Sequence, residues 1–198
     1  MITTQSFEKH FTNIEKEKKA IRKDLINSKK KYDLLKILIK KDKTIMAEEY
    51  LVNFLSDTDK IKYAIYASKS VLKNFEKYYP NDDKLKTTVE YIKEYLNNPT
   101  KEIVDKIEKI ISKTIIYSEI KAEDDYSDDT IDTDSPIHAI RVIKKAASLV
   151  CEHFKKEETD ISKYIYYINS DAGFGSENEK MEKKVLEYGL ELLKKSES

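Results

Sequence analysis

The chain has 198 residues, of which 37 are basic and 37 acidic, and 39% are hydrophobic. With one Cys, three His, three Gly and no Trp, it has no material for a disulfide framework and too few ligands for a Cys/His zinc cluster. The length suits one domain, or at most two small ones, with enough apolar residues for a core.

The first 43 residues predict a long basic helix, from about Ser6 to Lys41. Apolar residues recur there at alternating spacings of four and three, as in a heptad repeat, with interruptions at Lys18 and Ser28. Two interpretations stay open: the helix packs along its own domain, or it protrudes and dimerises as a coiled coil. The repeat consists of Phe7, Phe11, Ile14, Ile21, Leu25, Tyr32, Leu35 and Ile39.

Two further helices are predicted between residues 45 and 80. The first runs from about Ile45 to Leu55, and the run 56–59, Ser-Asp-Thr-Asp, then supplies N-cap candidates for the second. Pro80 disfavours helical geometry at the residue before it, so the second helix is expected to end at Tyr79. Its apolar face comprises Ile61, Ala64, Ile65, Ser68, Val71, Leu72 and Phe75.

Turn residues then separate two more predicted helices. The run 81–83, Asn-Asp-Asp, predicts a turn and an acidic cap at the positive end of the next helix. The run 97–100, Asn-Asn-Pro-Thr, ends that helix and begins another. The two apolar stripes are Leu85, Val89, Ile92 and Leu96, followed by Ile103, Ile107, Ile110, Ile111 and Ile115.

Between residues 121 and 135 the apolar pattern disappears, which predicts an exposed and mobile acidic loop. Ser135 and Pro136 then fit the N-cap and first position of a helix. The apolar face of that helix comprises Ile140, Ile143, Ala147, Val150 and Phe154.

The C-terminal part predicts a short helical element and a last helix. Glycine and proline mark only a few turns, and the run 170–176 is interpreted as the glycine-bearing loop between these two elements. Ser176 and Glu179 have capping-box spacing. The short element carries Tyr164, Ile165 and Ile168 after Thr159 or Asp160, and the last helix carries Met181, Val185, Tyr188 and Leu192. The sequence as a whole predicts a single all-α domain, a bundle of about eight helices.

The charges are separated along the chain although they sum to zero. Residues 1–43 hold thirteen Lys or Arg against six acids, a net charge of +7. Residues 119–134 hold eight acids against Lys121, a net charge of −7. These two segments either neutralise each other, within a fold or a dimer, or each faces its own partner.

Residues with catalytic or metal-binding chemistry are sparse. Cys151 lies on or beside a buried stripe, so we interpret it as a small core residue rather than a nucleophile. His138 and His153 begin and end one helix, and His153 is placed to interact with the C-terminal helix dipole. No spacing of His, Cys and acids matches a metal site, and Gly173 to Ser176 lacks the Lys and strand of a phosphate-binding loop. We therefore expect no enzyme activity, no cofactor and no metal.

The segment from Asp57 to Asn97 resembles the immunity protein family of bacterial polymorphic toxin systems. The resemblance comprises the run 64–86, followed by Val89-Glu90 and Tyr95-Leu96, with a weaker echo in residues 135–167. It implies a small all-α cytoplasmic protein that binds a cognate toxin and does no chemistry itself. Its signature would be carried by Phe75, Glu76, Tyr79, Pro80, Asp82 and Asp83.

We therefore expect a cytoplasmic binding protein that neutralises a protein partner by occupying it. The partner is expected to contact an acidic surface with a nearby tyrosine, which steers association with a basic face. Two alternatives are a structural protein that dimerises through the first helix, and a weak nucleic-acid binder that uses the basic patches of that helix. No apolar stretch is long enough to span a membrane. The expected contact residues are Glu123, Asp124, Asp125, Tyr126, Asp128, Asp129, Asp132 and Asp134.

Overall fold

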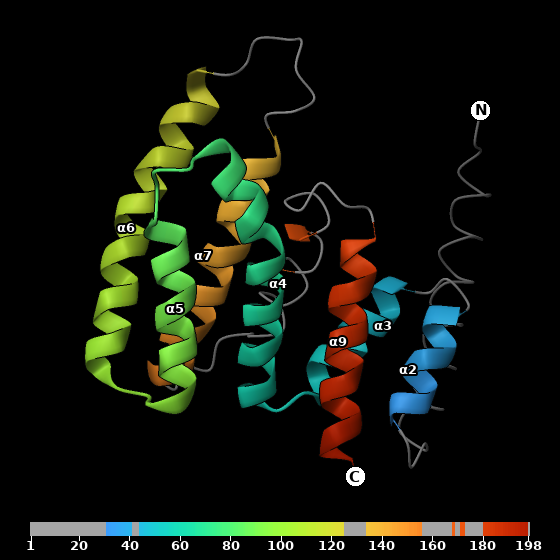
Figure 1. The fold of residues 1–198 in the computed structure, drawn as a ribbon. Coiled ribbons are helices and arrows are strands. Elements are labelled where there is room, and N and C mark those ends of the chain that lie inside the picture. The colour runs from blue at the N-terminus through green and yellow to red at the C-terminus, as the bar shows by residue number, and fades with distance from the viewer. Residues whose placement is uncertain are drawn as a thin grey trace, which may run out of the picture.

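Four consecutive antiparallel helices form one side of the fold (Figure 1). They are α4 (Asp57–Tyr78), α5 (Lys84–Asn97), α6 (Lys101–Asp124) and α7 (Asp134–Lys155). Each packs on its neighbour in the chain, and α7 also packs on α4 and α5, so that the four helices surround a common core. The computed structural model describes residues 31–40, 44–124, 134–155, 168, 171–172 and 180–197.

Three more helices extend this bundle on the far side of α4. They are α2 (Lys31–Lys40), α3 (Thr44–Phe54) and α9 (Met181–Ser196). The C-terminal helix α9 packs on α4, and α2 and α3 pack on each other and on α9. Figure 1 shows α9 between α4 and α2, so the end of the chain joins its beginning to the central bundle.

The two helices α4 and α7 pack on each other, and both carry small buried residues. Ala64 and Ala67 of α4 and Ala139, Ala146 and Ala147 of α7 are all fully buried. Small side chains let two helices approach closely, and larger residues such as Ile61 and Ile143 then fill the flanking space. The predicted apolar faces of these two helices are therefore confirmed as core-facing.

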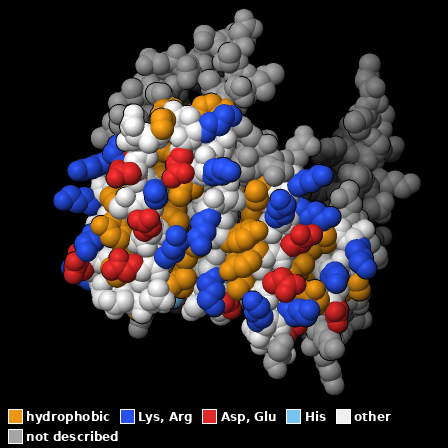
Figure 2. All heavy atoms as spheres, in the orientation of Figure 1, with side chains coloured by type: hydrophobic (Ala, Val, Ile, Leu, Met, Phe, Trp, Pro, Cys, Tyr) orange, Lys and Arg blue, Asp and Glu red, His pale blue; other side chains and the backbone are white. Residues whose placement is uncertain are grey.

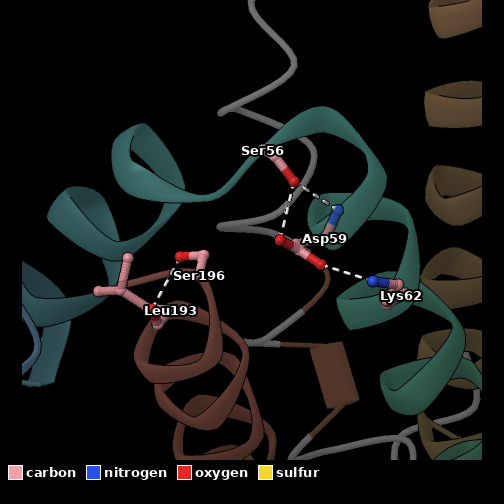
Figure 3. A network of polar contacts seen from close by, with 5 residues as sticks. All are labelled: Ser56, Asp59, Lys62, Leu193 and Ser196. Atoms are coloured by element: carbon pink, nitrogen blue, oxygen red, sulfur yellow. Dashed lines mark hydrogen bonds and ion pairs between the residues drawn. The ribbon is translucent and has the colours of Figure 1, made fainter. Parts of the chain in front are cut away.

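Side-chain hydrogen bonds mark the helix starts that the sequence predicted. The Ser56 hydroxyl accepts a hydrogen bond from the backbone N–H of Asp59 at 3.2 Å, and it also donates one to Asp59 Oδ2 at 2.8 Å. Asp59 in turn pairs with Lys62 at 2.8 Å (Figure 3). At the α5 start, Asp82 Oδ1 accepts from the backbone N–H of Lys84. The Ser56 hydroxyl and the Asp82 carboxylate thus satisfy free N–H groups at the starts of α4 and α5.

At the C-terminal end of α9, the side chains of Ser196 and Glu197 form hydrogen bonds with the backbone. The Ser196 hydroxyl donates a hydrogen bond to the carbonyl of Leu193 at 2.7 Å, as Figure 3 shows. The carboxylate of Glu197 accepts hydrogen bonds from the backbone N–H groups of Lys31 and Tyr32. The negative side chain just beyond α9 thus lies at the positive N-terminal end of α2, which fixes the two helices antiparallel to each other.

The all-α class is confirmed for the described part of the chain, which contains seven helices and no strand. Helix boundaries agree with the sequence at most breaks: α4 ends at Tyr78 before Pro80, and α5 ends at Asn97. Eight of the expected stripe residues pack against the core but are only partly buried: Tyr32, Ile39, Leu72, Leu96, Ile111, Phe154, Met181 and Tyr188.

Two predictions at the acidic loop need correction. We expected the loop to span 121–135, but α6 continues to Asp124 and α7 begins at Asp134, one residue before the expected cap. The chain thus stays helical through the first acids, because helical hydrogen bonding does not require an apolar face. Residues 125–133 lie outside the described residues.

The long N-terminal helix is described only over its last part. Residues 31–40 are helical as predicted, and Leu35 and Leu38 are buried against the fold. Because α2 packs on α3 and α9, this part of the repeat uses its apolar face within its own chain. The remaining repeat positions, and the capping box at Ser176, lie outside the described residues.

Candidate binding surfaces

A groove of about 570 Å³ runs between α2, α4 and α9, and we call it the α2–α9 groove. Three tyrosines supply aromatic surface to it, four lysines and two glutamates supply charge, and two aliphatic residues complete the apolar lining. These residues are Tyr32, Tyr66, Tyr188, Lys36, Lys40, Lys183, Lys184, Glu187, Glu191, Ile39 and Leu190. Figure 2 shows hydrophobic side chains running along the junction of α4 and α9, with basic and acidic side chains on both sides.

The aromatic part of the groove is held in place by stacking. The rings of Tyr66 and Tyr188 lie 4.3 Å apart between centroids with an interplanar angle of 11°, which joins α4 to α9. Lys36 Nζ and Lys194 Nζ lie 5.6 Å and 5.4 Å from the centre of the Tyr32 ring. Stacking and cation–π contacts of this kind fix the rings while leaving part of their apolar surface facing the groove.

The charge of the groove is positive, with four lysines against two glutamates, a net charge of +2. Within the described residues, Lys36, Lys40, Lys183 and Lys184 form no ion pair with a carboxylate, although Lys183 and Lys184 lie within one helical turn of Glu187. As far as the described residues show, their ammonium groups are therefore available to bind an anion from another molecule.

The predicted acidic contact segment lies at the junction of α6 and α7. Glu123 and Asp124 are the last residues of α6 and Asp134 is the first of α7. Asp125, Tyr126, Asp128, Asp129 and Asp132 are outside the described residues. In Figure 1 this junction lies at one end of the four-helix bundle, whereas α2 and α9 lie on the other side of α4. In this view α2, the described part of the basic arm, thus lies apart from the described ends of α6 and α7.

The helix dipole has opposite effects on acids at the two helix ends of this junction. The partial negative charge of a helix C-terminus makes each nearby carboxylate unfavourable by roughly 0.3–1 kcal/mol. Glu123 and Asp124 stand at such an end, whereas Asp134 stands at an N-terminus, where a carboxylate is favourable. Helix stability therefore explains Asp134 but not the acids that end α6.

The six residues of the family signature lie at the C-terminal end of α4 and in the turn that leads to α5. Phe75 is buried and its ring lies 5.0 Å from that of Tyr79, while the backbone N–H of Tyr79 donates to the Phe75 carbonyl. The backbone N–H of Asp82 donates to the Tyr79 carbonyl at 3.2 Å. Glu76 is partly buried, and Pro80 and Asp83 are exposed. The local contacts of this turn are those of a helix end, a proline break and an acidic helix start.

Asp171 is a buried acid that the sequence did not single out. It is 8% exposed, its Oδ1 lies 2.8 Å from Nδ1 of His138, and its Oδ2 pairs with Nζ of Lys145. Both partners belong to α7, so one carboxylate ties the described residues 171–172 to that helix.

The second histidine of α7, His153, joins this helix to α5. Its Nδ1 atom lies 2.8 Å from the Tyr95 hydroxyl. Both histidines therefore have structural partners, as expected.

Cys151 is buried, in agreement with its interpretation as a core residue. Removal from water, reinforced by the charge of Glu108 and only partly opposed by Lys155, raises the pKa of the thiol from 9.0 to about 11. Burial disfavours the thiolate, which is the reactive form of a cysteine.

We expect Cys151 to react slowly with thiol reagents in the native protein. At neutral pH a pKa higher by two reduces the thiolate fraction roughly 100-fold relative to an ordinary thiol. Release of thionitrobenzoate from Ellman's reagent, followed natively and in denaturant, measures this difference directly, because the chain has a single cysteine. Equal native and denatured rates would contradict it. Since the raised pKa favours the thiol in the folded state, its contribution to stability is complete below pH 9 and declines as the pH approaches 11.

Comparison with protein-family models, with curated proteins and with solved structures finds no match to this chain. In the described part of the chain, no group of three or more His, Cys, Asp or Glu side chains is placed to hold a metal ion. No helix in the same part combines the length and apolarity needed to cross a membrane. The fold and its surfaces thus define an all-helical bundle with a basic aromatic groove and a distant acidic junction.

Proposed function

We propose that this chain is a non-catalytic binding protein that occupies a protein partner through residues 119–134. The observation that carries the proposal is the position of the acids at the C-terminal end of α6, where they oppose the helix dipole. Because these acids lower the stability of the helix end, we infer that they contribute favourable energy in another way. Binding to a basic surface supplies it.

The proposed mechanism is electrostatic steering followed by occupation. A segment with eight acids and one lysine resembles a polyanion, and it accelerates encounter with a face that itself binds nucleic acid. Tyr126 within the segment adds apolar contact area and a hydroxyl, features that are common at protein interfaces. The partner therefore carries a basic patch at its contact surface.

The resemblance of residues 57–97 to immunity proteins supports a specific version of this proposal, in which the partner is a bacterial toxin. Phe75 and Tyr79 belong to the helix-packing turn described above. The signature residues therefore contribute to helix packing in the bundle, whereas residues 119–134 form the proposed contact with the partner. A cytoplasmic location and a role without chemistry belong to the same proposal.

Neutralising the acidic segment is expected to slow partner association at least tenfold at low salt and to flatten its salt dependence, since steering depends on the net charge of the segment. The variant is Glu123→Gln, Asp124→Asn, Asp128→Asn and Asp129→Asn, which keeps the chain length between α6 and α7. The partner is captured from the native strain, identified by mass spectrometry and purified for stopped-flow or biosensor measurements.

A matched control removes acids from the α4–α5 turn instead, through Asp83→Asn and Glu76→Gln. This variant should associate at the wild-type rate if residues 119–134 are the contact. An unchanged association rate for the neutralised segment would refute the steering mechanism. Equal enrichment of all captured proteins by wild-type and neutralised bait would refute the proposed contact.

A further inference from the structure

The α2–α9 groove is not used by the function proposed above, yet it has the chemistry of a binding site. Its lysines have a net excess over its glutamates and are not ion-paired within the described residues. Its tyrosines present apolar ring surface between two charged borders. A complementary occupant must therefore carry excess negative charge along its length and at least one aromatic or aliphatic side chain.

Residues 119–134 of the same chain meet this description. They combine eight acids and one lysine with Ile120 and Ala122 in α6 and two further apolar side chains, Tyr126 and Ile131, after the end of α6. The acids match the lysines of the groove, and a tyrosine fits beside the stacked pair of Tyr66 and Tyr188, because offset and edge-to-face ring contacts are favourable. The chain thus contains both a basic aromatic groove and an acidic segment with an aromatic residue.

The two surfaces lie apart on one molecule. The groove is formed by α2, α4 and α9, whereas the acidic segment joins α6 to α7, whose helix contacts are with α4, α5 and each other. Figure 1 places the α6–α7 junction at one end of the bundle and α2 beyond α9 on its other side. The described ends of α6 and α7 thus lie away from the groove of their own molecule in this view, which favours a neighbouring molecule as the source of the occupant.

We infer that the α2–α9 groove receives the acidic segment, residues 119–134, of a second copy of this chain. The interface is heterologous, since a groove on one copy meets a different surface on the next. Such contacts form head-to-tail chains or closed rings rather than a two-fold symmetric dimer. The inference does not require a toxin or any other partner.

The first test measures self-association of the full chain by sedimentation velocity over a concentration series at low and high salt. We expect oligomers at low salt that dissociate as salt screens the lysine–carboxylate attraction. The charge-reversed groove, Lys36→Glu with Lys183→Glu, should weaken association at least tenfold. Lys86→Glu with Lys109→Glu, which changes two exposed lysines on α5 and α6, is the matched control and should behave as wild type.

The second test identifies the occupant. A fluorescent peptide of residues 119–134 should bind the full chain at low salt and lose at least tenfold in affinity with the reversed groove. A peptide with Tyr126→Ser and Ile131→Ser keeps every charge and should bind several-fold more weakly, since it lacks the apolar contacts. A chain carrying Asp128→Lys and Asp129→Lys should not self-associate, and neither should the reversed-groove chain. Their mixture should associate, because the native groove of one then meets the native acidic segment of the other.

These measurements decide whether the groove binds the acidic segment of a second copy. A monomer at all concentrations and salt levels, or a peptide whose affinity ignores the groove lysines, overturns it. Association that persists in the reversed groove assigns self-contact to another surface, such as the N-terminal helix, and also overturns it. If the chain with the neutralised segment loses partner binding but the wild-type chain does not self-associate, the proposed function is supported and the self-association is refuted. The two proposals can therefore be tested separately.

Discussion

Replacing Gly189 with valine is expected to lower the free energy of unfolding by about 3 kcal/mol or more. Gly189 lies in the middle of α9, where a Cβ atom would stand 2.5 Å from Leu51 Cδ2 and 2.7 Å from Tyr63 Cε2. Ordinary carbon contacts are about 3.5–4.0 Å. Leu51 and Tyr63 are both fully buried, so neither has free space into which it can move.

The smaller substitution Gly189→Ala gives a graded comparison. Overpacking by one methyl costs about 1–3 kcal/mol, and the better helix propensity of alanine offsets about 1 kcal/mol of that cost. Thermal unfolding followed by circular dichroism should therefore rank wild type, alanine and valine in that order, with a fall of about 2–4 °C for each kcal/mol. Glu187→Val, at an exposed position on the same helix, is the control, and an equal loss there would show that the close contacts of residue 189 are not the cause.

A double variant tests the contact itself. Leu51→Ala removes the Cδ2 atom that the new Cβ would meet, and it destabilises the protein by about 2–5 kcal/mol through the cavity it leaves. Adding Gly189→Ala to this variant should recover part of the loss, because the methyl then occupies vacated space. Strict additivity of the two losses would contradict the predicted close approach of α9 to α3 and α4.

Replacing Asp171 with asparagine is expected to destabilise the protein by about 2–3 kcal/mol. The carboxylate is 11% exposed and lies between the Nδ1 atom of His138 and the Nζ atom of Lys145. Asparagine keeps the shape but removes the charge, so the Lys145 ammonium stays half-buried without its carboxylate. The expected loss is below the roughly 3–5 kcal/mol of a fully buried pair, since the two partners keep 18% and 24% of their side-chain exposure.

Chemical denaturation of a double-mutant cycle separates this pair from general damage. Lys145→Met should reduce the cost of Asp171→Asn by about 1–2 kcal/mol, because the Asp171–Lys145 ion pair is then already absent. The control is Glu108→Gln, which removes an exposed ion pair between α6 and α7 and should cost about 0–1 kcal/mol. A cost for Asp171→Asn no larger than that of the control would mean that the cluster does not hold residues 171–172 on α7.

The helical class and most helix boundaries were predictable from local chemistry. Ser56 accepts the hydrogen bond expected of an N-cap residue, and α4 ends immediately before Tyr79 and Pro80. The buried positions of α5 and α7 followed from apolar spacing alone. Such features depend on neighbours within one helical turn, which is why sequence order is enough to find them.

Predictions failed where a residue acts through a distant part of the chain. Residue 189 lies inside the last predicted helix, but the need for a glycine there depends on the close approach of Leu51 and Tyr63. Asp171 appeared to be one acid of a loop, and its role depends on two residues of α7 that are 33 and 26 positions away. The acidic run appeared too polar to be helical, but α6 extends into it as far as Asp124.

The sequence by itself determined an all-helical chain whose zero net charge is the sum of a +7 arm and a −7 segment. Only the tertiary structure decided where these charges lie relative to each other. The packing of α2 on α3 and α9 places Lys36 and Lys40 beside Tyr66 and Tyr188, at a site remote from the α6–α7 junction. The physical reason is that helix packing is long-range in sequence: buried apolar faces select the neighbours, and the charged groups on the opposite faces follow.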